Sequence, residues 1–338
     1  MSRSQQKAAG DRAGRGAARR RATGSVFARP AVLAPIALLV LAFAGWLWLQ
    51  QRAAAEARAE RTRLLQLVQS ATTRAEPDRD ELSRLAADIA ACPDHETAPD
   101  LLAAMARIEL ARGRPERAQA LFGVVAASPG ASPEQQGLGA AILIRLHETD
   151  VGDAAAATGM LREAEALAAR AYDASRDPAD LLRAWQAATR LRDEATADRH
   201  ATALVAAAPD APATRLVQLA TTFEPKTTSP AEVAALRAEF APIPPELEVL
   251  HVMLLLQAGD VRAAAAAAEE LLLRAPGVFA VRVATAVVFH ACGFGYPAGS
   301  VERAQWLRRR DPQLDWLLSH APADDARRAR WTELRTQR

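Results

Sequence analysis

The longest uninterrupted apolar stretch of the chain lies near its amino terminus. Residues 30–51 read PAVLAPIALLVLAFAGWLWLQQ, a run of 22 residues without a charged side chain. As a helix rising about 1.5 Å per residue, this run covers about 33 Å, which matches a hydrocarbon core of about 30 Å. Trp46 and Trp48 fall at its end, where amphipathic rings favour the headgroup layer. The pattern predicts a single transmembrane helix over residues 30–51.

A cleaved signal peptide is the alternative interpretation of the same stretch. The small residues Ala53, Ala54 and Ala55 satisfy a cleavage rule after an apolar run. Against cleavage, the run exceeds the usual apolar length of a signal peptide. Its two tryptophans, followed by Gln50, Gln51 and Arg52, also intervene before the alanines. We therefore expect an uncleaved anchor and keep cleavage as the alternative.

Beyond residue 51, helical periodicity continues with regular interruptions. No Gly or Pro occurs until Pro77, which predicts a helical stalk over residues 52–76. Apolar-periodic segments of about 12 to 20 residues then alternate with short polar breaks, a pattern typical of antiparallel helices joined by tight turns. We expect an all-α repeat domain over residues 77–310 and capping helices over residues 311–338. The breaks contain Pro93, Pro99, Gly113, Pro115, Pro129, Gly152, Pro178, Pro209, Pro230, Pro245, Gly259 and Pro276.

A ladder of small and apolar residues recurs within these helix pairs. It is clearest in residues 245–276, where Gly259 is followed by Ala264, Ala268, Leu271 and Pro276. The other copies are Arg192, Ala197, Ala201, Leu204 and Pro209; Gly113, Ala118, Phe122, Val125 and Pro129; and Gly152, Ala157, Leu161 and Ala164. Small Ala lets helices approach closely, Gly allows a left-handed turn, and Pro ends the second helix.

This ladder resembles the tetratricopeptide repeat (TPR), over about residues 97–310. The resemblance implies an α-solenoid of antiparallel helix pairs that must stack to hide their apolar faces. The sequence departs from the family pattern at Arg192, which replaces a turn glycine, and at Glu248 and His251, where members usually have Trp or Leu. Between Pro209 and Pro245 the loop 224–229 stands where the glycine turn belongs.

The resemblance also implies a binding surface. In tetratricopeptide proteins the first helix of each pair lines a groove that holds peptides or partner segments. That groove would here be drawn from Arg107 and Leu110 in one repeat, Gln186 and Arg190 in another, and Met253 and Gln257 in a third. Trp185 is expected to pack between helices instead, as large aromatic residues usually do.

Charge is distributed unevenly along the chain. Residues 1–29 contain eight Lys or Arg against one acid, leaving 34 basic and 39 acidic groups of the 42 and 40 in the whole chain. The acidic body argues against a nucleic-acid groove. Six Lys or Arg precede the apolar run within twenty residues and four follow it, which places the amino terminus in the cytoplasm. We expect residues 1–29 to be a disordered basic tail and the repeat domain to face the periplasm of a Gram-negative cell.

Candidate reactive residues are few. Cys92 and His95, together with His290 and Cys292, are residue types that bind metals, but the two pairs are about 200 residues apart in a solenoid whose distant repeats do not touch. The glycine-rich segment 293–299 follows a helix, whereas phosphate-binding loops follow a strand. Its Phe294 and Tyr296 could instead contact a partner. Recognisable nucleophile triads, HExxH and Walker motifs are missing from the sequence.

These features predict a non-enzymatic, single-pass inner-membrane scaffold that binds other proteins at the periplasmic face, in assembly, secretion or quality control. No cofactor, metal, nucleic acid or small-molecule substrate is expected. The alternative is a secreted or periplasmic helical-toroid enzyme released by signal cleavage, and a cytoplasmic repeat domain is a third interpretation.

Overall fold

The computed structural model describes residues 30–72, 74, 77–126, 131–149 and 154–337, with side chains from Phe43 onwards, Ala126 excepted. The chain divides into two compact units, Met1–Arg61 and Thr62–Arg338. The predicted basic tail, residues 1–29, lies outside the described residues, as do Pro129 and Gly152 of the repeat ladder.

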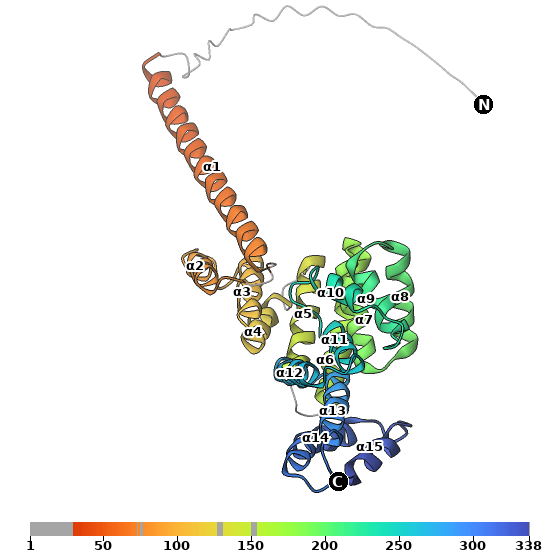
Figure 1. Ribbon diagram of the computed structural model, residues 1–338. Coiled ribbons are helices and arrows are strands. Elements are labelled where there is room, and N and C mark those ends of the chain that lie inside the picture. The colour runs from red at the N-terminus through yellow and green to blue at the C-terminus, as the bar shows by residue number, and fades with distance from the viewer. Residues whose placement is uncertain (1–29, 73, 75–76, 127–130, 150–153, 338) are drawn as a thin grey trace, which may run out of the picture. The chain divides into compact units, whose positions relative to one another are not determined.

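Helices form all of the regular secondary structure in the described residues, which confirms the all-α prediction (Figure 1). Their bounds are α1 Pro30–Thr72, α2 Arg79–Ala90, α3 Pro99–Ala111, α4 Pro115–Ala126, α5 Pro133–Thr149, α6 Ala154–Ser175, α7 Pro178–Leu191, α8 Glu194–Ala207, α9 Pro212–Thr222, α10 Pro230–Arg237, α11 Pro245–Gln257, α12 Val261–Arg274, α13 Phe279–Phe294, α14 Val301–His320 and α15 Arg328–Thr336.

The first unit contains α1 up to Arg61. Its described apolar side chains lie on the surface: Phe43, Trp46, Trp48 and Leu49 are each more than half exposed. Within the described residues, no helix combines the length and the hydropathy that a membrane crossing requires. The side chains of residues 30–42, most of the apolar run, lie outside this description.

The second unit begins at Thr62, within α1 and within the predicted stalk 52–76. From Leu64 onwards α1 joins a buried cluster with α2 and α3, in which Val68 and Ala71 are almost fully covered. Burial of these apolar side chains fixes the end of α1 on the helices that follow.

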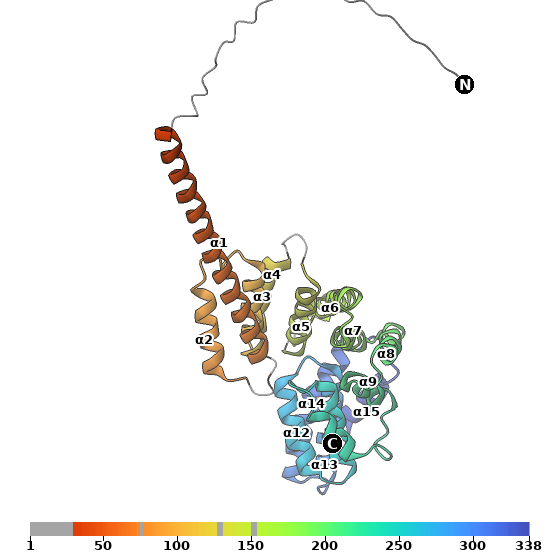
Figure 2. The same cartoon turned by 90° about the horizontal axis from the view of Figure 1, so that it is seen from above.

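The helices from α3 to α14 are arranged as successive pairs: α3 with α4, α5 with α6, α7 with α8, α9 with α10, α11 with α12, and α13 with α14 (Figures 1 and 2). The first helix of each pair contacts the first helix of the next, from α3 through α13. Each second helix also packs against the first helix of the following pair. This is a helical-repeat arrangement, compatible with an α-solenoid.

Prolines at the starts of helices and left-handed turn residues after them explain these helix bounds. Proline opens α3, α7, α9, α10 and α11, where its missing amide donor is not needed. Turns in the left-handed region follow the first helix of three pairs, at Gly113 (φ 72°), Arg192 (φ 63°) and Gly259 (φ 79°). Arg192 therefore occupies the same backbone conformation as the glycines it replaces in the ladder.

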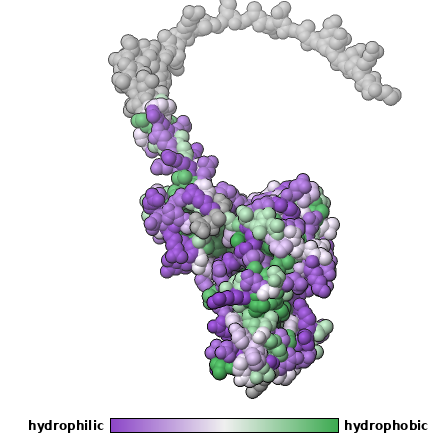
Figure 3. Space-filling view, in the orientation of Figure 1, coloured by the Kyte–Doolittle hydropathy of each residue, from purple (hydrophilic) through white to green (hydrophobic). Residues whose placement is uncertain are grey.

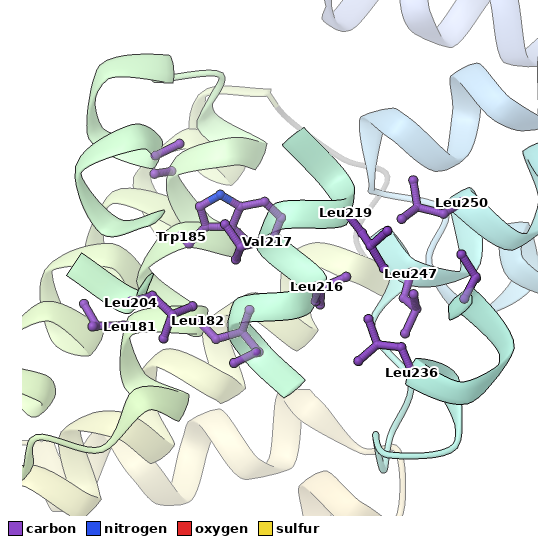
Figure 4. Packing of buried hydrophobic residues seen from close by; sticks show 14 of the residues in the cluster. Leu181, Leu182, Trp185, Leu204, Leu216, Val217, Leu219, Leu236, Leu247 and Leu250 are labelled. Carbon is purple, nitrogen blue, oxygen red and sulfur yellow. The ribbon is translucent and has the colours of Figure 1, made fainter. Parts of the chain in front are cut away.

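The ladder residues form the core between the paired helices. Ala118, Ala164, Ala197, Ala264 and Ala268 are all buried. The predicted loop 224–229 separates α9 from α10. Figure 4 shows side chains of α9 between Trp185 of α7 and Leu247 of α11. Trp185 is buried in this cluster, which confirms its predicted packing role.

The expected boundary between residues 77–310 and 311–338 falls inside a helix. α14 runs from Val301 to His320 and contains Pro312 without ending there. With α15 and α13 it encloses a cluster built on Leu314, Leu317 and Trp331. α14 therefore extends on both sides of the expected boundary.

Candidate protein-binding surface

The first pair of predicted groove residues lies on α3. Arg107 is half-buried and its Nη2 lies 2.8 Å from Oε1 of Glu134 on α5, an exposed carboxylate. Leu110 is half-buried against a cluster that joins α3 to α6. Both side chains keep part of their surface open to solvent.

The second pair, Gln186 and Arg190 on α7, is buried. The Arg190 side chain is only 3% exposed and forms ion pairs with Glu148 at 2.9 Å and Glu246 at 2.8 Å. Gln186 Nε2 donates a hydrogen bond to the second oxygen of Glu246 at 3.2 Å. Arg145 completes the arrangement with a 2.6 Å contact to Glu148. We call these five residues the Arg190 network.

Electrostatics stabilises the network. Burial alone would lower the pKa of Arg190, but the adjacent Glu246 and Glu148 carboxylates outweigh it and raise that pKa above its ordinary value. Two cations face two carboxylates, so the network is neutral as a whole. Breaking such a buried pair by removing one partner costs about 3–5 kcal/mol.

The network joins three first helices, because Glu148 belongs to α5, Arg190 to α7 and Glu246 to α11. The backbone carbonyl of Glu148 also accepts a hydrogen bond from Gly277, in the turn between α12 and α13, at 2.9 Å. Gln186 and Arg190 thus bind other helices of the same unit. In the structure these contacts fix the positions of α5, α7 and α11 relative to one another.

The third pair lies further along α11. Met253 is half-buried, and Gln257 is exposed at the carboxyl end of the helix. Within the described part of the chain, no hydrogen bond or ion pair joins the three predicted pairs to one another. The structure therefore joins Gln186 and Arg190 to Glu246 at the start of α11, whereas Met253 and Gln257 lie further along the same helix.

The sequence pattern did not indicate that Glu148 and Glu246 take part in a buried ion-pair network. Both are acids in mainly apolar first helices, LGAAILIRLHET and PELEVLHVMLLL. Buried carboxylates are rare unless paired, so an acid in such a segment is a signal for a cationic partner elsewhere. Sequence alone does not say which arginine is that partner.

A second polar cluster joins the end of α7 to the end of the chain. Arg192 donates to Asp325 in the turn between α14 and α15, and its guanidinium lies 4.8 Å from the ring centre of Phe279. Arg327 also binds Asp325 and lies 5.3 Å from the same ring. Hydrogen bonds, first from Arg327 and then from Arg192, hold the pKa of Asp325 far below its usual value.

The residues considered as metal ligands have other neighbours. Nδ1 of His95 lies 2.8 Å from the carbonyl oxygen of Cys92, and Nδ1 of His290 lies 3.2 Å from Nη1 of Arg310. Of the residues that the structure describes, no three His, Cys, Asp or Glu form a group able to hold a metal ion. The glycine-rich segment 293–299 covers the end of α13 and part of the turn before α14, with Phe294 and Tyr296 partly exposed.

These observations define the class of the protein as an all-α, helical-repeat-like protein in which buried ion pairs join the first helices α5, α7 and α11. No protein-family model matches the chain, and no curated protein sequence matches it.

Proposed function

We propose that the protein is a membrane-tethered, TPR-like scaffold that binds other proteins at the periplasmic face of the inner membrane. The observation that carries this proposal is the unbroken succession of first-helix contacts from α3 to α13. Stacked pairs of this kind present an extended surface that suits recognition of polypeptide segments. Hydrophilic and hydrophobic residues are interspersed on the face of the second unit shown in Figure 3, as on protein-binding surfaces.

The tether rests on the sequence of residues 30–51 and on the exposure of α1. Phe43, Trp46 and Trp48, with Leu47 and Leu49, present apolar surface to solvent in the described part of the first unit. Large apolar side chains that cluster on a surface indicate contact with another apolar phase. A bilayer is the phase that fits an uncharged run of this length.

Partner contact is assigned to the groove residues that stay accessible. Arg107, Leu110, Met253 and Gln257 retain exposed or half-exposed side chains. Gln186 and Arg190 act behind this surface, because their network fixes the spacing of α5, α7 and α11.

Site-specific photocrosslinking in intact cells tests this proposal. A photoreactive amino acid is placed at Arg107 or Gln257 in the full chain, with a matched control at Ala206, an exposed residue of the second helix α8. We expect discrete crosslinked protein bands at residues 107 and 257 and none at residue 206. The same yield at all three positions, or no crosslink at residues 107 and 257, would contradict the proposal.

A further inference from the structure

A histidine near the end of α13 contacts a buried arginine of the next helix. His290 is half-buried, and its Nδ1 atom lies 3.2 Å from Nη1 of Arg310 on α14. Arginine offers donors only and stays protonated, so Nδ1 of His290 must accept this hydrogen bond. His290 is therefore neutral in this arrangement, with its proton on Nε2.

The position of Arg310 is fixed by further contacts. Its side chain is only 1% exposed. Its Nε and Nη2 atoms donate to Oδ1 of Asp311 at 3.0 and 2.7 Å, and Nη2 also donates to the backbone carbonyl of Gln337, just after α15, at 3.0 Å. Arg335 of α15 donates to the other oxygen of Asp311 at 2.9 Å. Arg310 thus joins α13, α14 and the end of the chain.

Arginines from two helices disfavour a positive charge on His290. Burial, and then Arg310, Arg330 and Arg303, lower the pKa of His290 below its ordinary value. Arg310 and Arg303 belong to α14, and Arg330 belongs to α15. A proton added to His290 would therefore meet cations on both of the last two helices.

The carboxylates near this cluster are already bound to arginines. The pairs are Asp311 with Arg310 on α14, Glu333 with Arg330 on α15, and Glu269 of α12 with Arg309. α11 meets α13 through apolar side chains such as Val252. Asp311 binds the Nε and Nη2 edge of Arg310, whereas His290 faces Nη1.

The aromatic neighbour of His290 does not compensate for this repulsion. The ring of Phe294 lies 4.2 Å from the imidazole ring, and an aromatic face can attract a cation. The guanidinium of Arg303, however, already lies 3.9 Å from the centre of the Phe294 ring. A charged His290 would share that ring with an existing cation.

We infer that His290 is an acid-sensitive contact whose protonation loosens α14 and α15 from α13. A protonated imidazole offers only donors, so the hydrogen bond from Arg310 is lost and an imidazolium faces a buried guanidinium. Loosening of these helices exposes the cluster of Leu314, Leu317 and Trp331, which is buried in the closed arrangement. The inference is independent of the membrane tether and of partner binding.

The sign of the pH effect follows from the direction of the pKa shift. The pKa of His290 is lower in the folded chain than the ordinary value of 6.5, so the opened state binds the proton more readily. The contact stabilises α14 and α15 fully above that ordinary pKa. This stabilisation is lost progressively as the pH falls below it.

Hydrogen exchange of the full chain in a non-ionic detergent, measured by mass spectrometry at about pH 7.5 and about pH 5, tests the inference. Labelling times are scaled to equal intrinsic exchange at the two pH values. We expect protection of α14 and α15 to fall by about threefold to thirtyfold at the lower pH. The upper limit arises because a free histidine at about pH 5 is protonated about thirtyfold in excess of its neutral form.

Two variants assign the effect to His290. His290→Asn keeps an acceptor oxygen for Arg310 but does not take up a proton, and should remove the pH response of α14 and α15. His320→Asn changes another histidine of α14, whose Nδ1 lies 2.9 Å from the carbonyl oxygen of Trp316, and should keep the response. A response of the same size in wild type and His290→Asn, or no loss of protection in wild type, would overturn the inference.

The pH profile of the wild type provides a second measurement in case His290→Asn already exposes these helices at neutral pH. Loss of protection that follows the uptake of one proton below about pH 6.5 supports the inference. Loss that begins only near about pH 4, where free carboxylates take up protons, would contradict it.

Discussion

At the level of single residues, two arginines at similar positions in the repeat pattern have different environments in the structure. Arg107 and Arg190 were both predicted as groove residues, because each lies on the first helix of a pair. The structure leaves Arg107 beside an exposed carboxylate and buries Arg190 between two carboxylates. The difference comes from the ion-pair partners: Glu134 for Arg107, and Glu148 with Glu246 for Arg190. These partners belong to other helices, so the sequence pattern of a single helix does not reveal them.

These environments predict different stability effects. Arg190→Ala leaves two buried carboxylates short of a cation and should lower the free energy of unfolding by about 3–5 kcal/mol. The matched change Arg107→Ala removes a solvent-screened pair and should cost about 0–1 kcal/mol. Urea denaturation followed by circular dichroism measures both. Equal losses in the two variants would show that the Arg190 network does not hold the first helices together.

Among the helices, the positions of proline and glycine in the sequence predicted well where helices begin and end. Pro, Asp and Gly act locally: Pro178 opens α7 after the capping Asp177, and Gly259 ends α11. The sequence did not predict that α14 continues through Pro312, or that Arg192 binds Asp325 in the turn before α15. Packing explains the continuation of α14, since the α13–α15 cluster outweighs one lost backbone hydrogen bond.

The contact between Arg192 and Asp325 should control how firmly the last helix is held. In Asp325→Ala, the guanidinium groups of Arg192 and Arg327 lose their shared carboxylate. We expect faster amide hydrogen exchange in α15, measured by mass spectrometry, with α3 to α6 unchanged. Asp324→Ala alters the exposed neighbouring acid and is the control. If Asp325→Ala and Asp324→Ala exchange alike, the turn between α14 and α15 does not anchor α15.

At the scale of the whole molecule, the sequence predicted an all-α chain of stacked pairs, and the structure agrees. The hydrophobic pattern and the composition are enough to predict this architecture, because each helix pair repeats the same apolar spacing and the same turn residues. The binding surface itself stays a prediction. The sequence does not show that Gln186 and Arg190 contact carboxylates of α5 and α11, because that network depends on three helices meeting, which no single segment encodes.

We propose that residues 30–51 tether the repeat unit to the membrane and that this unit lies outside the cytoplasm. Protease added to spheroplasts that produce the full chain, with tags at both ends, tests this topology. We expect that the chain sediments with membranes, that the carboxyl-terminal tag is lost to protease, and that the amino-terminal tag survives on a short membrane-bound fragment. A chain recovered in the soluble fraction, or a carboxyl-terminal tag protected until the spheroplasts are lysed, would contradict it.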